Sequence, residues 1–158
     1  MRSLGLDLGE RHTGVAVSDP HGMIAFPLTV IEHRDDEQVL SRVLQMCDER
    51  GVSRLVVGMP YLMDGQEGSQ AAWARALTDK LRARTGRVVE LWDERLSTWS
   101  AERALREAGP RRRTKDRVHP DAVAAAYILQ SYLDHLHSGE DAEEEQAVSE
   151  HQDDAPNI

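Results

Sequence analysis

Short apolar runs separated by turns make up the start of the chain. The runs lie at Ser3–Leu8, Val15–Ser18 and Ile24–Ile31, and the segments between them contain glycine beside acidic or proline residues. Such runs are typical of β-strands joined by tight turns. The pattern predicts three strands in an antiparallel meander.

Helical spacing replaces this pattern in the next segment. Apolar residues recur every three or four positions from Val39 to Cys47, behind acidic residues, and the pattern ends at Gly51. This arrangement predicts a capped amphipathic helix. The further predicted elements, in chain order, are a buried strand at Arg54–Met59, a helix at 69–85, a strand at Val88–Trp92, a helix at 99–108 and a helix from Pro120 to about His137.

Strands and helices alternate after the meander, which predicts an α/β fold. Parallel strands linked by crossover helices extend the meander into one mixed sheet of five strands, flanked by helices. A chain of 158 residues has the size of one ordinary domain. We therefore expect a single hydrophobic core.

The composition changes at the end of the chain. Residues 138–158 contain eight acidic residues and no Lys, Arg or aromatic residue. Such a segment buries too little apolar surface to offset the entropy of ordering. We expect one domain at 1–137 and an acidic disordered tail at 138–158. The tail accounts for most of the net charge of −9, so the acidity does not argue against a nucleic-acid partner.

Two classes of protein are excluded by the composition. A single cysteine, Cys47, rules out a disulfide framework within the chain and a zinc site with several cysteines. No segment approaches the ~18 consecutive apolar residues that a membrane span needs. We expect a cytoplasmic protein without a membrane partner.

Acidic residues stand at the ends of the predicted strands, where parallel sheets bind ligands. Asp7 lies within the apolar run from Leu4 to Gly9. A carboxylate there is costly unless it binds a metal or accepts several hydrogen bonds. The alternative is an aspartate that stabilises the turn at Gly9.

Two further positions are candidates. Asp93 and Glu94 close the fifth strand, and because side chains alternate between faces, at most one should share a pocket with Asp7. The alternation does not choose between them, and both could instead form a solvated strand end. Asp121 lies in the first turn of the last helix, where a favourable interaction with the helix dipole would also explain it.

Carboxylates from three distant parts of the chain suit a hard cation such as Mg²⁺ or Mn²⁺. Such a set favours phosphodiester hydrolysis by bound metal ions. A basic run lies before Asp121 and would bring phosphate-binding charge to the pocket, although such runs are more often solvated loops. The run spans Arg111–Arg117, and its candidate phosphate-binding residues are Arg111, Arg112, Arg113 and Lys115. His12 and His119 are left out of the catalytic set.

Several sequence blocks together resemble the YqgF/RuvX family, and they occur in the same order as in that family. The blocks are Gly5–Gly9, Gly14–Asp19, Val56–Pro60, the loop residues Asp64, Gly65 and Gly68, Asp93–Thr98 and Asp121–Gln130. The resemblance implies an RNase H-like fold and a divalent-metal nuclease site at Asp7, Glu94 and Asp121. It also implies processing of the 5′ end of pre-16S ribosomal RNA, with ribosomal precursor particles as partners.

Other functions remain open at this point. The resemblance also covers Holliday junction resolution on DNA, which would require a homodimer with two sites. A nucleic-acid-binding ribosome-assembly factor without catalysis is a further alternative. The Asp-x-Gly hairpin of Asp7 and Gly9 is similar to the phosphate loop of sugar kinases and actin-like ATPases, but those proteins need two such domains, and the length here suits one.

Overall fold

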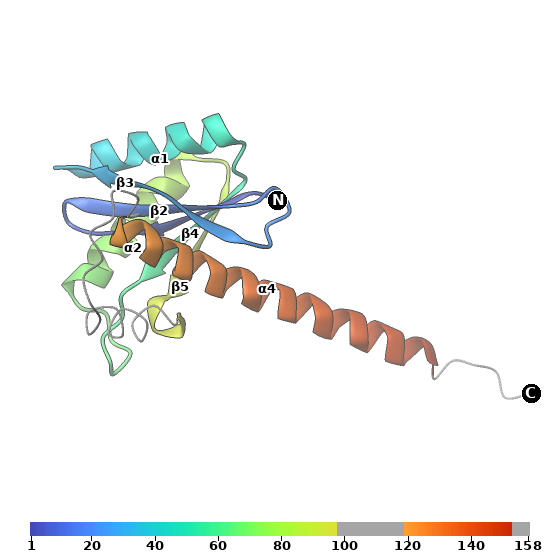
Figure 1. Ribbon diagram of the computed structural model, residues 1–158. Coiled ribbons are helices and arrows are strands. Elements are labelled where there is room, and N and C mark those ends of the chain that lie inside the picture. The colour runs from blue at the N-terminus through green and yellow to red at the C-terminus, as the bar shows by residue number, and fades with distance from the viewer. Residues whose placement is uncertain (98–118, 153–158) are drawn as a thin grey trace, which may run out of the picture.

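The computed structural model describes residues 1–97 and 119–152, with side chains up to residue 139. Figure 1 shows the elements in chain order. They are β1 (Ser3–Asp7), β2 (His12–Ser18), β3 (Ala25–Glu32), α1 (Asp36–Arg50), β4 (Arg54–Met59), α2 (Ser69–Arg84), β5 (Val88–Asp93), the short 3₁₀ helix η1 (Glu94–Leu96) and α4 (Pro120–Gln152).

The strands form one mixed sheet in the order β3-β2-β1-β4-β5. The pairs β1–β2 and β2–β3 are antiparallel, whereas β1–β4 and β4–β5 are parallel. The predicted combination of an antiparallel meander with parallel strands is therefore confirmed. Because β1, β4 and β5 run in the same direction, their carboxyl ends lie at one edge of the sheet.

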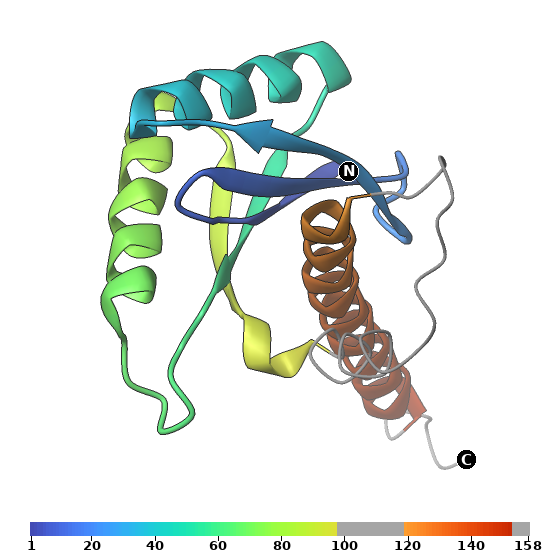
Figure 2. The same ribbon diagram turned by 60° about the vertical axis from the view of Figure 1, so that its left-hand side comes forward.

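Helices cover both faces of this sheet. Helices α1 and α2 lie on one face and α4 on the other, as Figure 2 shows. The alternation of side chains along a strand supplies both cores. Leu4 and Leu6 of β1 pack with the α1 and α2 side, while a β-carbon on Gly5, between them, would lie 2.7 Å from Leu129 Cβ of α4.

The ends of the helices follow from local chemistry. The Asp35 side chain accepts a hydrogen bond from Gln38 N and caps α1, and Gly51, in the left-handed region at φ 63°, ends it. Helix α4 begins at Pro120, as predicted. It continues to Gln152, so the predicted end near His137 is wrong.

Other predicted boundaries have different outcomes. Strand β2 begins at His12, earlier than the predicted Val15, because His12 pairs with Glu32 of β3. The predicted helix at 99–108 lies outside the described residues. The division into a domain at 1–137 and a tail at 138–158 stays a prediction. No helix in the described ranges is long and apolar enough to cross a membrane.

Candidate active site

A cavity of about 410 Å³ opens at the edge where β1, β4 and β5 end. We call it the acidic cavity, because the three predicted carboxylates lie in its wall. The residues of the wall that matter for its chemistry are Asp7, His12, Gln70, Glu94, Ser97 and Asp121. The sequence prediction therefore selected three side chains that the fold brings to one cavity.

Glu94 reaches Asp7 across an intervening strand. Asp7 ends β1 and Glu94 follows β5, with β4 between them. Neighbouring strands lie about 4.8 Å apart, so the two backbones are separated by roughly twice that distance. The strand between them has Gly58 at the crossing point, where a β-carbon would lie 2.8 Å from Glu94 Oε1. Because Gly58 has no side chain, there is room over β4 for the Glu94 side chain to extend toward Asp7.

The contact between the two carboxyl groups changes the acidity of Glu94. Burial is the largest cause that raises the pKa of Glu94, and together with the charge of Asp7, a hydrogen bond with Asp7 and the charge of Asp93 it brings this pKa to about 8. Two carboxylates in contact cannot both be ionised cheaply in a desolvated site. One proton is therefore held between Asp7 and Glu94 at neutral pH.

Asp93, the competing candidate, is committed elsewhere. Its Oδ2 accepts a hydrogen bond from Arg95 Nη2 at 2.6 Å, and its Oδ1 accepts from Arg95 N at 3.0 Å. These contacts lower the pKa of Asp93, with the Arg95 side-chain hydrogen bond as the largest cause. Arg95 also donates to Leu62 O at 3.3 Å. Asp93 therefore holds η1 and the neighbouring loop in place, and Glu94 is the one of the two that enters the acidic cavity.

Asp121 reaches the cavity because α4 comes unusually close to the sheet. Asp7 pairs with Gly14 of β2 in the sheet register. A β-carbon on Gly14 would lie only 1.9 Å from the main-chain oxygen of Asp121. Gly14 therefore allows the first turn of α4 to lie directly on β2, beside Asp7. His119 accompanies Asp121, with Nδ1 3.6 Å from its Oδ2.

The acidic cavity also contains residues that sequence reasoning did not select. Gln70 of α2 donates to Leu8 O at 3.5 Å, and the Ser97 hydroxyl donates to Glu94 O at 2.9 Å. His12, left out of the catalytic set, lies in the wall, and its ring stacks on His119 with 6.3 Å between centroids. Only the fold reveals these neighbours, because each comes from a different element.

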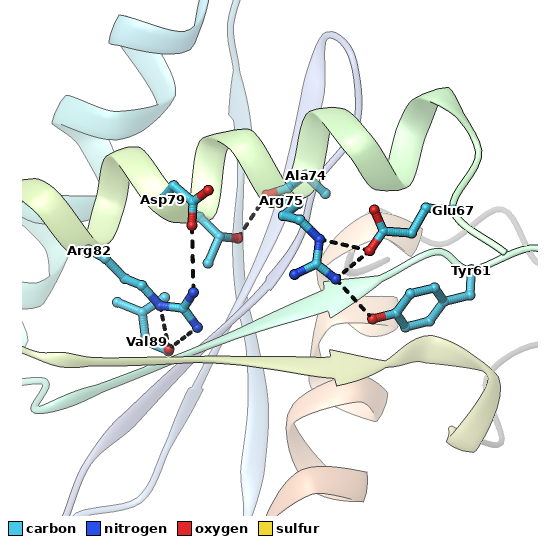
Figure 3. A network of polar contacts seen from close by, with 8 residues as sticks. Tyr61, Glu67, Ala74, Arg75, Asp79, Arg82 and Val89 are labelled. Atoms are coloured by element: carbon cyan, nitrogen blue, oxygen red, sulfur yellow. Dashed lines mark hydrogen bonds and ion pairs between the residues drawn. The ribbon is translucent and has the colours of Figure 1, made fainter. Parts of the chain in front are cut away.

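The loop at 60–68 forms one side of this region, and α2 holds it. Arg75 Nε donates to Glu67 Oε1 at 2.7 Å, and Arg75 Nη2 donates to Tyr61 OH at 3.5 Å. Figure 3 shows these contacts between the first turns of α2 and the loop. One arginine thus joins both ends of the loop to the same helix.

The predicted basic residues and the predicted metal ligands have different outcomes. The basic residues Arg111, Arg112, Arg113 and Lys115 lie outside the described residues, so their contact with substrate stays a prediction. Within the described residues, no three His, Cys, Asp or Glu side chains are grouped closely enough to hold one metal ion between them. Asp7 and Glu94 are in contact, and Asp121 lines the same cavity.

Comparison with solved structures supports the same architecture. A RuvC from Thermus thermophilus, solved in complex with a Holliday junction substrate, matches with a TM-score of 0.56 over 84% of this chain and 94% of that chain. The two sequences are 17% identical, so the likeness concerns the fold alone. The RNase H-like fold predicted from the sequence is confirmed.

Sequence relatives are much closer. A protein from Anaeromyxobacter sp. is 48% identical over 139 residues, which cover 87% of this chain and all of the relative. A protein from Desulforudis audaxviator is 42% identical over 88% of this chain and 98% of its own length. Both have the provisional name pre-16S rRNA nuclease. Residues 1–135 match the family described as RuvX, Holliday junction resolvase, and the chain therefore belongs to the RuvX family.

Proposed function

We propose that this protein is a nuclease that hydrolyses phosphodiester bonds with the help of a divalent cation, Mg²⁺ or Mn²⁺. The observation that carries the proposal is the contact between Asp7 and Glu94, two carboxyl groups brought together across β4 in a partly buried cavity. Family membership and the relatives named as nucleases agree with this chemistry.

The pair of carboxyl groups fits a hard divalent cation. Oxygen ligands are the ones that Mg²⁺ and Mn²⁺ prefer, and Mg²⁺ often binds through one or two carboxylates together with waters and substrate phosphates. A cation at this place would replace the proton that Asp7 and Glu94 share. Asp121, which lines the same cavity, would be a further oxygen ligand.

Each residue of the acidic cavity has a defined task in this proposal. A bound divalent ion supplies electrostatic stabilisation of the phosphate and activation of water. Asp7 and Glu94 provide the negative charge that binds such an ion, and Gly58 keeps Glu94 extended toward Asp7. His12 and Gln70 stand in the wall where a phosphate would enter, and the Ser97 hydroxyl fixes the backbone of Glu94.

The substrate that we propose is RNA, specifically the precursor of 16S ribosomal RNA within ribosomal precursor particles, because this is the activity in the names of the relatives. Binding through Arg111, Arg112, Arg113 and Lys115 and a cytoplasmic location are parts of the same proposal. A four-way DNA junction is the second candidate, favoured by the description of the family. Paired nicks in a junction need two active sites, so this candidate requires a homodimer.

Cleavage of labelled substrates compared side by side tests the proposal. The substrates are an RNA that spans the 5′ end of 16S ribosomal RNA, a single-stranded DNA and a four-way DNA junction, each in Mg²⁺, Mn²⁺ or EDTA. We expect cleavage of the RNA with either cation and none in EDTA. Faster cleavage of the junction by a dimer would favour the second candidate. Cleavage in EDTA, or no cleavage of any substrate, would contradict the proposed function.

A further inference from the structure

A second cavity adjoins the acidic cavity. Its volume is about 450 Å³, and its wall consists of Arg11, His12, Glu32, His33, Arg34 and Gln38. We call it the arginine cavity. His12 belongs to the walls of both cavities, so a ligand that leaves the acidic cavity past His12 enters the arginine cavity.

The fold fixes the two arginines beside each other. Arg11 precedes β2 and Arg34 follows β3, and these strands are antiparallel, with His12 opposite Glu32. The backbone oxygen of Arg11 accepts a hydrogen bond from His33 N at 2.9 Å. The backbone N–H of Arg34 donates to Gln38 Oε1 at 2.8 Å. Both side chains therefore extend from anchored backbone at the same end of the hairpin.

A buried polar contact between His33 and Thr13 stabilises this end of the hairpin. His33 is buried and lies 2.8 Å from Thr13 Oγ1 through its Nε2. Burial is the main cause that lowers the pKa of His33; the charge of Asp36 opposes it most, and a hydrogen bond with the Gly9 backbone opposes it least. His33 thus connects the turn that follows Asp7 with β2 and with the wall of the arginine cavity.

The guanidinium groups of Arg11 and Arg34 are exposed and have no ion-pair partner among the described residues. The cations of α2, in contrast, each pair with an acidic residue. These are Arg75 with Glu67, Lys80 with Asp36, Arg82 with Asp79 and Arg84 with Glu37. The acid in the wall of the arginine cavity, Glu32, lies 3.8 Å from His12 Nε2. The cavity therefore presents two uncommitted guanidinium groups to an incoming ligand.

We propose that Arg11 and Arg34 bind the phosphates of a nucleic-acid strand that extends from the acidic cavity past His12. A guanidinium group matches the geometry of phosphate oxygens and can donate two parallel hydrogen bonds to them. The wall contains no Phe, Tyr or Trp ring on which a base could stack. The contact is therefore independent of sequence and holds the strand in register with the carboxylates. This inference rests on the proposed nuclease function, since it assigns the path of the same substrate.

Salt-dependent binding tests this assignment. Fluorescence anisotropy of a labelled single-stranded RNA would be measured with the full chain in EDTA, over a range of salt concentrations. The variants are Arg11→Gln, Arg34→Gln and both together. Arg42→Gln is the matched control for each single variant, because Arg42 is an exposed arginine of α1 that donates to Gln45 Oε1 at 3.0 Å and its loss changes the net charge by the same amount. Circular dichroism would verify that each variant folds.

Each lost phosphate contact should lower the slope of log K against log salt by about 0.7 for a single strand. We expect the double variant to lose about twice that amount, with weaker binding at low salt, and the control to retain the slope of the unchanged protein. A double variant with the slope and affinity of the control would overturn the assignment. So would an intact protein that does not bind the RNA.

Cleavage assays on the same proteins separate the two claims. If the protein cleaves RNA but the slope of log K against log salt is the same with and without the two arginines, the proposed function stands and this inference fails. If the substitutions lower this slope but the unchanged protein cleaves no substrate, this inference stands and the proposed function fails. The two measurements are independent, because binding in EDTA requires no turnover.

Discussion

The main-chain oxygen of Asp121 lies 1.9 Å from the position that a β-carbon on Gly14 would occupy. Because backbone cannot yield as a side chain does, Gly14→Ala should push the first turn of α4 away from β2. We expect a loss of stability of about 1–3 kcal/mol, as for other overpacked sites, and loss of cleavage. Urea unfolding and a cleavage assay measure both effects.

The matched control is Gly86→Ala, where an added β-carbon meets nothing within 4 Å. This variant should retain stability and activity. If Gly14→Ala behaved in the same way as Gly86→Ala, the close approach of α4 to β2 would have no role in placing Asp121.

Gly58→Ala should separate activity from stability. The added carbon would lie 2.8 Å from both Glu94 Oε1 and Ile128 Cδ1, which are ends of flexible side chains and can move. We therefore expect a stability loss below about 1 kcal/mol, smaller than that of a backbone clash, together with a large fall in cleavage rate because Glu94 no longer reaches Asp7. Equal retention of rate and stability would show that Glu94 does not need the gap at Gly58.

Substitution of the two carboxylates tests their chemistry directly. Asp7→Asn and Glu94→Gln should each reduce cleavage by at least about a hundredfold, the usual effect of removing a key electrostatic group, while the circular dichroism spectrum stays unchanged. Asp93→Asn is the control at the neighbouring position, because Asp93 is held by Arg95 outside the cavity wall. An Asp93 variant with a greater defect than Glu94→Gln would reverse the assignment.

The contact between α1 and α2 should make stability depend on pH through Asp36. Its pKa is lowered from 3.8, first by the hydrogen bond from Lys80 and then by the hydrogen bond from Trp73. A carboxyl group with a depressed pKa stabilises the folded state above its unfolded pKa, and this stabilisation is lost as the pH falls through the folded value. Asp36→Asn should therefore unfold at lower urea concentration at pH 7, and the difference should shrink below pH 3.8.

Asp79→Asn is the control for this measurement, since Asp79 is an exposed acid of α2 with its Oδ1 3.6 Å from Arg82 Nη1. Exposed pairs of this kind contribute little to stability. A difference between Asp36→Asn and the unchanged protein that stayed constant from pH 7 to acid would show that the charge of Asp36 is not its source.

The end of α4 should be dispensable for the stability of the fold. The last described contacts of this helix with the body involve Leu136, which packs on the core, and His137, whose Nε2 lies 3.0 Å from Gly22 O. Removal of residues 138–158 should therefore change the melting temperature by less than about 2 °C. Leu133→Ala, within the buried part of the helix, should lower the stability by about 2–5 kcal/mol. A large fall on truncation would mean that the acidic segment packs against the body.

The sequence was sufficient for most of the fold because its patterns are local. Arg54–Met59 is a strand with the predicted bounds, and Gly51 ends α1 as predicted. The end of α4 was misplaced, because the change from apolar to acidic composition near His137 was interpreted as the end of the helix. Acidic residues can continue a helix after its packing face ends, and composition alone does not distinguish these cases.

The site was less accessible to sequence reasoning because it depends on contacts between distant elements. The choice between Asp93 and Glu94 follows from Gly58, which makes room for one, and from Arg95, which retains the other. Residue spacing along one strand contains no information about a neighbouring strand. The arginine cavity cannot be predicted from the sequence for the same reason, since Arg11 and Arg34 come together only when β2 and β3 pair.

Helix α4 supplies Asp121 and also covers one face of the sheet, yet it comes last among the described elements, after β1 and β5. During synthesis, Asp7 and Glu94 therefore leave the ribosome before the helix that completes their cavity. An unfinished chain has the first two acids but neither the third nor the cover for Val56 and Ala16, which are buried against α4 in the finished protein. The cavity is therefore complete only in a chain that has been made at least as far as α4, because its acids come from both ends of the described sequence.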